Sequence, residues 1–208
     1  FASAELIAIG DGAARINALV TGQVDVINKV DLKTVALLKR NPNLVIEETK
    51  GAQHYTFPML TDSPVFQSND VRMAMKHAIN RETLLSSVLY GYGLVGNDHP
   101  IQPGSRFINT ALEQRSYDPD KSRFYLKKAG MDSLKVRLQA SDAAYTGAVD
   151  ASVLFKEQAR AAGIDIDVVR EPADGFFSNV WMKQPFTTSF WYSSLTADRM
   201  FSIGYAKG

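Results

Sequence analysis

The 208-residue sequence contains no cysteine. This excludes structural disulfides, zinc sites built on thiolates and cysteine nucleophiles. The sequence also has no apolar run near the roughly 20 residues that are needed to cross a bilayer, so we do not expect it to span a membrane. Lysine and arginine number 23 against 22 acidic residues and are scattered. Nucleic-acid binding requires a concentrated positive surface, so it is not expected either.

The composition is that of a folded protein, with 45% hydrophobic and 22% charged residues. A chain without cysteine suits an oxidising compartment such as a bacterial periplasm, although many cytosolic proteins also lack cysteine. The sequence starts with neither an initiator Met nor a signal-peptide pattern, inside an expected strand at 4–9, and it stops soon after an aromatic-rich segment. We therefore expect a fragment of a longer protein; the alternative is a mature start left by processing.

The first quarter of the sequence alternates apolar β-prone segments with segments of helical spacing. Gly51-Ala52 then marks an expected domain boundary. The expected elements are strands over 4–9, 24–27 and 44–47 and helices over 13–21 and 31–40. This order, β-α-β-α-β, is the unit of a layered α/β sheet.

The remaining sequence also mixes helices and strands, around a loop-rich stretch at 92–117 that contains several glycines and prolines. Asp11, Asn80, Asp118 and Asp174 are expected to cap helices. The expected elements are an extended segment at 53–59, helices within 69–79, 80–91, 119–129, 149–162 and 174–181, and strands over 135–140, 164–168 and 188–192. The fold class is therefore α/β, a mixed sheet flanked by helices.

Motifs of catalysis and cofactor binding are few. The glycines of residues 91–96 match G-x-G-x-x-G but follow a helix and precede a proline-rich loop, which favours loop flexibility over a nucleotide site. His54, His77 and His99 lie far apart, without a second ligand at helical or hairpin spacing. We therefore expect no metal, no cofactor and no enzymatic activity.

The aromatic segment Phe190-Trp191-Tyr192 is the most suggestive local cluster. It is followed by two serines and then by Asp198. Aromatic walls with a few polar groups are typical of small-ligand pockets. A core strand with one solvated end would give the same pattern, so both readings stay open at this point.

Several segments, in order along the chain, resemble the peptide/nickel-binding family of ABC-importer solute-binding proteins, which includes dipeptide and oligopeptide receptors. The strongest resemblance is carried by residues 69–91, NDVRMAMKHAINRETLLSSVLYG. Residues 11–25, DGAARINALVTGQVD, and the segment Tyr117-Asp118-Pro119-Asp120-Lys121 are similar to two further family motifs. Each motif alone is a packing or capping signal.

The resemblance implies two lobes that close over a peptide or related small solute without chemistry, and delivery of that solute to the transmembrane permease. Residues 1–52 would be the end of lobe one, a β-α-β-α-β remnant. Residues 53–208 would be lobe two, incomplete at its C-terminus. The protein would be periplasmic, or tethered outside the membrane.

The resemblance also suggests the ligand contacts. Trp191 matches an aromatic residue of the family and would stack on the ligand. A cationic group of the ligand would donate a hydrogen bond to Asp198 or to Asp142. Asp198 lies a few residues later than the family's aspartate. The arginine that dipeptide receptors use has no counterpart at 141–145, which argues against a strict dipeptide specificity. The full candidate set is Trp191, Tyr192, Asp198, Asp142, Tyr145 and His54.

Two other function classes remain open. An α/β enzyme would require a nucleophile and a base that converge in a cleft. A ligand-sensing module would use the same fold without transport.

Overall fold

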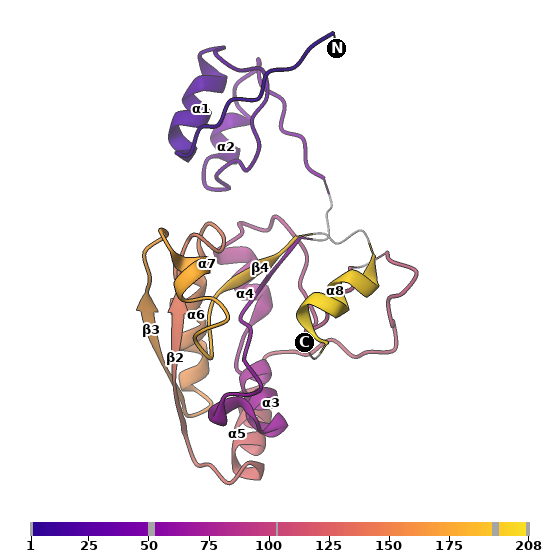
Figure 1. The fold of residues 1–208 in the computed structure, drawn as a ribbon, viewed down its shortest axis with the longest axis vertical. Helices are drawn as coiled ribbons and strands as arrows, with labels where there is room; N and C mark the ends of the chain where they lie inside the picture. Colours follow the sequence, from indigo (N-terminus) through magenta and orange to yellow (C-terminus); the bar gives the residue numbers. More distant parts are fainter. Residues whose placement is uncertain (1, 50–52, 103, 193–195, 207–208) are drawn as a thin grey trace. The chain divides into compact units, whose positions relative to one another are not determined.

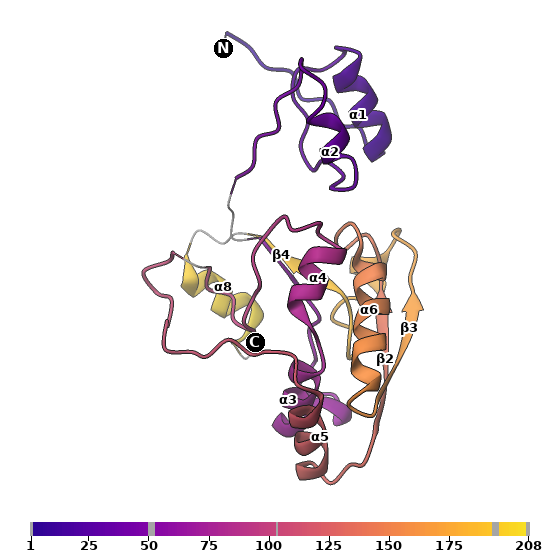
Figure 2. The same ribbon diagram turned by 180° about the vertical axis from the view of Figure 1, so that it is seen from behind.

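The computed structural model describes residues 2–49, 53–102, 104–192 and 196–206. The chain divides into two compact units, Phe1–Thr49 and Lys50–Gly208 (Figures 1 and 2). The boundary signal at Gly51-Ala52 lies outside the described residues, as do Ser193 and Ser194.

The first helix of the first unit begins as the local sequence predicts, but the second begins later and is short. In α1 (Gly12–Val20), the Asp11 carboxylate accepts a hydrogen bond from the amide of Ala14, which confirms the predicted cap. Helix α2 covers only Val35–Leu38 instead of 31–40. The Asp31 side chain accepts a hydrogen bond from the amide of Lys33, and the Asp31 carbonyl oxygen accepts one from the Thr34 hydroxyl. These local bonds hold a turn that competes with the helix.

The three strands predicted in the first unit, at 4–9, 24–27 and 44–47, do not form: residues 2–49 contain no strand. A strand needs a neighbouring strand to pair its backbone amides and carbonyls, and the described part of this unit supplies none. Leu6, Val26 and Val45, which the prediction placed in a sheet, are 98%, 83% and 80% exposed.

The helices of the second unit mostly follow their predicted caps. The side chain of Asn80 accepts from the amide of Thr83 at 3.0 Å, and that of Asp118 from Lys121 at 2.8 Å. The predicted cap at Asp174 is wrong, because the cap position is Gly175 in a left-handed conformation. The helices are η1 (Pro64–Phe66), α3 (Asn69–His77), α4 (Arg81–Ser87), α5 (Pro119–Lys128), α6 (Ala148–Arg160), α7 (Phe176–Asn179) and α8 (Ala197–Gly204). The first and the last of these were not predicted.

Four strands of the second unit form two ladders. Strands β1 (His54–Thr56) and β4 (Ser189–Trp191) pair antiparallel. Strands β2 (Leu134–Ala140) and β3 (Ile164–Arg170) pair parallel, with α6 between them in sequence and packed against them (Figure 2). The mixed α/β fold predicted from the sequence is thus confirmed.

The parallel ladder is apolar on one face and charged on the other. Ile164 and Ile166 are buried, whereas Asp165 and Asp167 face solvent, as their alternation predicts. Across the ladder, Lys135 lies 3.8 Å from Asp165 and Arg137 lies 3.3 Å from Asp167. Because side chains alternate along a strand, a register slip of one residue would expose the isoleucines and bury the aspartates.

The main core of the second unit lies between this ladder and the helices around it. Helix α5 packs closely on α3, where the Ser122 hydroxyl donates to the Ala74 carbonyl oxygen at 2.8 Å. The core is dominated by aromatic and branched side chains, among them Phe66, Phe155, Phe186, Leu126, Leu138, Ile164 and Ile166.

Gly147, which precedes α6, is a position where alanine is expected to be costly. Its φ is +86°, and an added Cβ would lie 2.8 Å from Cγ1 of Val88. Gly130 has a similar φ of +77° but open space around it. We expect Gly130→Ala to lower the free energy of unfolding by about 1–2 kcal/mol, the cost of a left-handed conformation. Gly147→Ala should lower the free energy of unfolding by about 1–3 kcal/mol more than Gly130→Ala does, because the added methyl group overpacks against Val88.

Urea denaturation of the two glycine variants beside the unsubstituted chain checks this expectation. Gly130→Ala is the matched control, because it carries the backbone cost without the contact on Val88. If both variants lost the same free energy of unfolding, the contact with Val88 would not be the cause of the extra cost predicted for Gly147→Ala.

Candidate ligand-binding site

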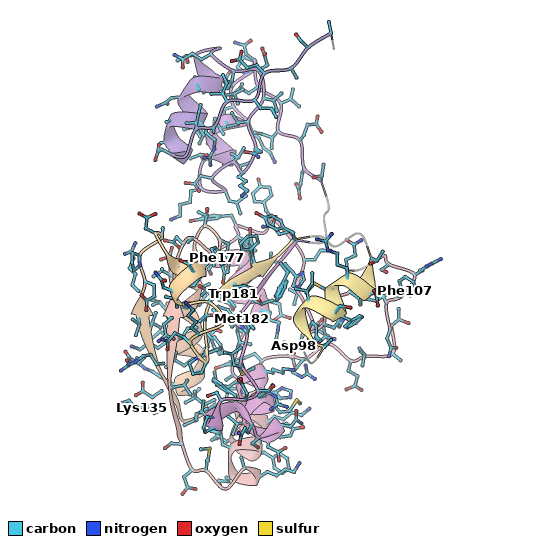
Figure 3. The ribbon with its side chains drawn as sticks, viewed as in Figure 1. Asp98, Phe107, Lys135, Phe177, Trp181 and Met182 are labelled. Atoms are coloured by element: carbon cyan, nitrogen blue, oxygen red, sulfur yellow. The ribbon has the colours of Figure 1, made fainter. Side chains whose placement is uncertain are left out.

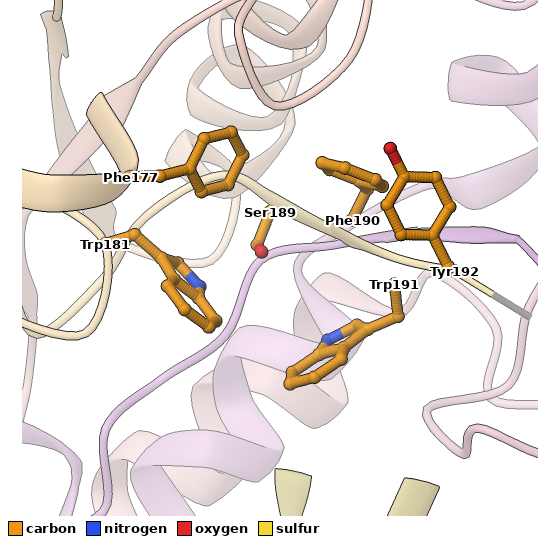
Figure 4. Close-up of a pocket in the computed structure, with 6 residues that line it drawn as sticks. All are labelled: Phe177, Trp181, Ser189, Phe190, Trp191 and Tyr192. Carbon is orange, nitrogen blue, oxygen red and sulfur yellow. The ribbon is translucent and has the colours of Figure 1, made fainter. Parts of the chain in front are cut away.

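An aromatic pocket of about 400 Å³ opens beside β4 and α7 (Figure 4). Its wall comes from α7 and the turn that follows it, and from β4 and the residue after it. Five of the six lining residues carry aromatic rings. They are Phe177, Trp181, Ser189, Phe190, Trp191 and Tyr192, and we call this set the aromatic pocket.

The β1–β4 ladder holds the strand that supplies half of the pocket. In its register, His54 lies opposite Trp191 and Tyr55 lies opposite Phe190. Tyr55 also stacks on Tyr145, with ring centroids 4.1 Å apart and an angle of 13° between the planes. Strand β4 is therefore held by backbone hydrogen bonds to β1, and β1 is itself held by the stacking of Tyr55 on Tyr145.

The rings of the pocket pack edge to face. Trp181 and Trp191 have centroids 6.1 Å apart with an interplanar angle of 71°. Phe177 lies 6.1 Å from Trp181 and 5.8 Å from Phe190, again with steep angles. This is a favourable geometry for aromatic pairs, worth about 0.5–1.5 kcal/mol for each beyond the area buried. The wall is therefore stiff, and it presents ring faces and edges to an incoming group.

Helix α8 packs against Trp191. A Cβ placed on Gly204 would be 3.5 Å from Cη2 of Trp191 and 3.6 Å from Cε of Met200. This close approach fits glycine or alanine, and a larger residue at 204 would push on the indole. Helix α8 thus supports the Trp191 ring, although no residue of α8 is among the six lining residues.

The polar chemistry of the pocket is sparse. The Ser189 hydroxyl lies among the rings (Figure 4), and its Oγ is buried with no hydrogen-bond partner among the residues that the structure describes. A buried hydroxyl without a partner is rare, because buried polar groups are normally paired with protein, ordered water or a bound molecule. No Asp, Glu, Lys, Arg or His is among the six lining residues. The pocket is therefore suited to uncharged groups.

The structure brings together three of the six residues predicted from the sequence. Trp191 and Tyr192 line the aromatic pocket. His54 does not line it but is the cross-strand neighbour of Trp191. The sequence of the aromatic segment indicates either a pocket wall or a strand, and Trp191 belongs to both.

The other three predicted residues are not among the lining residues. The Asp142 carboxylate accepts from the amide of Val149 at 3.2 Å, at the start of α6. Tyr145 is buried, and burial raises the pKa of its hydroxyl, so it stays protonated. Asp198 is exposed in the first turn of α8, where a negative charge favours the helix.

Phe177, Trp181 and Ser189 are pocket residues that the sequence analysis did not single out. Phe177 and Trp181 are separated by four positions, the spacing that places two side chains on one helix face. That spacing was a usable signal for the two aromatic residues. Nothing local distinguishes Ser189, because its place in the pocket depends on the pairing of β4 with β1.

The pocket lacks the partners that hydrolytic chemistry requires. A serine nucleophile needs a base within hydrogen-bond reach, and no histidine or carboxylate lines the pocket beside Ser189. Within the described ranges, no group of three or more His, Asp or Glu side chains could hold a metal ion. No described helix is both long and apolar enough to cross a bilayer.

Comparison with known proteins gives a family match over almost the whole chain. Residues 2–205 match the family model described as bacterial extracellular solute-binding proteins, family 5 middle. The peptide transport periplasmic protein SapA of Salmonella typhimurium is 27% identical over 186 residues, which cover 86% of this chain and 33% of that protein. The chain thus spans about a third of the length of this relative.

Solved structures share the fold. The dipeptide-binding protein of Pseudoalteromonas sp. SM9913, in complex with Met-Leu, aligns with a TM-score of 0.77 at 22% identity, over 93% of this chain and 39% of that one. NikZ of Campylobacter jejuni, in complex with Ni(L-His), aligns with a TM-score of 0.74 at 22% identity, over 93% and 40%. The same fold thus holds a dipeptide in one protein and a nickel complex in another.

Proposed function

The chain belongs to family 5 of the bacterial extracellular solute-binding proteins, and we propose that it is part of the substrate-binding component of an ABC importer. Its second unit forms most of lobe two, and its first unit forms the end of lobe one. The two lobes of the whole protein close over a peptide or a related small solute, and the closed form is recognised by the permease. The protein acts in the periplasm or tethered outside the membrane, without catalysis.

The observation that carries this proposal is the aromatic pocket, an apolar wall with one unpartnered hydroxyl. Binding sites for small molecules combine such apolar surface with a few polar groups that fix orientation. The pocket favours solutes with an apolar or aromatic side chain over solutes that offer only charged ends. Peptides meet this requirement, in keeping with the transport of peptides by SapA and the binding of Met-Leu by the Pseudoalteromonas protein.

The charged ends of a peptide are held outside the aromatic pocket in this proposal. Asp142 and Asp198 are exposed, and either carboxylate could take the peptide amino group. The peptide carboxylate would be held by lobe one or by solvent, because the segment at 141–145 contains no arginine.

The fluorescence of tryptophan tests the proposal directly, because the chain contains only two tryptophans and both line the aromatic pocket. Titration with Met-Leu is expected to shift the emission in a saturable way. A whole receptor with micromolar affinity gains about 8 kcal/mol, and one lobe that supplies half of this would bind near millimolar.

Gly-Gly is the matched control for this titration, since it has the same charged ends and no side chain for the pocket. It should bind at least about tenfold more weakly, because two buried apolar side chains are worth more than the 1.4 kcal/mol that this ratio requires. No saturable shift with Met-Leu, or equal affinity for both dipeptides, would contradict the proposed role of the pocket.

A further inference from the structure

A second, smaller cavity of about 150 Å³ lies at the end of α3 and against the loop-rich segment 92–117. It shares no lining residue with the aromatic pocket. Charged and polar side chains dominate its wall, and we call it the basic cavity. Among the residues that line it are Lys76, Asn97, Asp98, His99, Glu113 and Arg115.

Asp98 is the anionic centre of the wall. Its Oδ1 accepts from Nη2 of Arg81 at 2.7 Å, and its Oδ2 accepts from Nη1 of Arg115. Burial alone would raise the pKa of Asp98, but the two guanidinium groups outweigh this and hold it below its usual value. Asp98 is therefore a carboxylate that is already engaged by two cations.

Lys76 is a further cation beside this pair, and it is half-buried. Burial lowers its pKa, and repulsion from Arg115, Arg72 and Arg81 adds to this, while attraction to Asp98 opposes it. Three arginines thus act on Lys76 across this region, and two of them, Arg81 and Arg115, share the Asp98 carboxylate. Lys76 and Arg115 line the cavity together with two carboxylates, Asp98 and the exposed Glu113. Arg72 and Arg81 lie near Lys76 as well, so positive charge exceeds negative charge around this partly desolvated site, where Coulomb interactions are stronger than in bulk water.

The loop that frames the cavity is held in place by its own hydrogen bonds. The Asn97 side chain donates to the Glu113 carbonyl oxygen at 2.9 Å and accepts from the Arg115 amide at 2.8 Å. The Gln114 side chain donates to the Gly96 carbonyl oxygen at 3.0 Å. Glu113 itself is an exposed residue. The two loop segments are therefore tied together, and the wall is preformed.

We propose that the basic cavity binds a small oxyanion, the carboxylate or phosphate group of a solute, between Lys76 and Arg115. Liquid water occupies roughly 30 Å³ per molecule, so the cavity has room for a group the size of a few waters. Arginine offers a planar fork of N–H donors that matches such an oxyanion, and lysine adds a point charge. The site shares no lining residue with the aromatic pocket and does not depend on the importer function.

Calorimetric titration of the 208-residue chain with sodium phosphate, and separately with sodium acetate, tests the proposal and distinguishes the two oxyanions. Sodium chloride at matched ionic strength is the blank. We expect saturable binding of at least one oxyanion. Lys76→Met should weaken it by about tenfold or more, because the oxyanion loses a hydrogen bond to a charged group. Lys76→Arg, which keeps the charge, should retain binding.

Lys135→Met is the control for the loss of one positive charge, because Lys135 lies on β2, far from Asp98 (Figure 3). Asp98→Asn adds an independent check: if the cations are available to an oxyanion, removal of the competing carboxylate should strengthen binding. Absence of saturable binding to the unsubstituted chain would overturn the proposal. Equal weakening by Lys76→Met and Lys135→Met would also overturn it, because only general charge would then matter.

Discussion

Phe186→Ala is expected to lower the free energy of unfolding of the second unit by about 3–5 kcal/mol. Phe186 is 1% exposed, and its ring meets Phe57, Phe66 and Phe155 with centroids 5.4–6.4 Å apart. Removal of this ring leaves a cavity between side chains that come from different elements, and that cavity cannot collapse without moving all of them. Urea denaturation followed by circular dichroism measures the loss.

Phe124→Ala is the control for this core substitution. Phe124 is 60% exposed on α5, so truncation of its ring should change the unfolding free energy by no more than about 0.5 kcal/mol. A loss below about 1 kcal/mol for Phe186→Ala would show that the ring cluster is not the centre of the core.

Loss of either tryptophan of the aromatic pocket is expected to weaken solute binding by about 30-fold, which corresponds to the 2 kcal/mol that marks a dominant aromatic contact. Trp181 and Trp191 meet at 71°, so each indole holds the other in place. The double variant should therefore lose less binding free energy than the sum of the losses in Trp181→Ala and Trp191→Ala. The measurement is calorimetric titration with Met-Leu.

The controls for the tryptophan variants separate the pocket from general effects on the surface. Phe107→Ala removes an exposed aromatic ring that does not line the aromatic pocket, and it should leave the affinity unchanged. Trp191→Phe should lose less affinity for Met-Leu than Trp191→Ala, because it keeps an aromatic ring in the pocket wall and in contact with α8. Equal affinities for all these variants would place the solute elsewhere.

The sequence was sufficient to predict features that depend on near neighbours. Asp11, Asn80 and Asp118 cap helices because a side-chain oxygen reaches an amide three positions ahead, which requires no tertiary contact. The alternation of isoleucine and aspartate in β3 predicted its buried face for the same reason. Helix α8 was missed although Thr196 accepts from the amide of Arg199, a cap of the same kind.

Features that depend on distant partners could not be predicted in this way. The segments at 4–9, 24–27 and 44–47 have strand-like sequences, but a strand forms only where another strand pairs with it. In the aromatic pocket, Trp191 could be predicted from its own segment. Its contact with Trp181 follows from the packing of the turn after α7 against β4, which no local pattern specifies.

The antiparallel ladder that fixes the pocket joins the two ends of the second unit. The Thr56 hydroxyl bonds to the Ser189 carbonyl oxygen across 133 positions of the chain, whereas β2 and β3 pair across a single helix. The entropy lost on closing a loop grows with loop length, so the short-range β2–α6–β3 element should order early and the β1–β4 ladder late. The wall that meets the solute would then be among the last parts of the unit to assemble, and among the first to open.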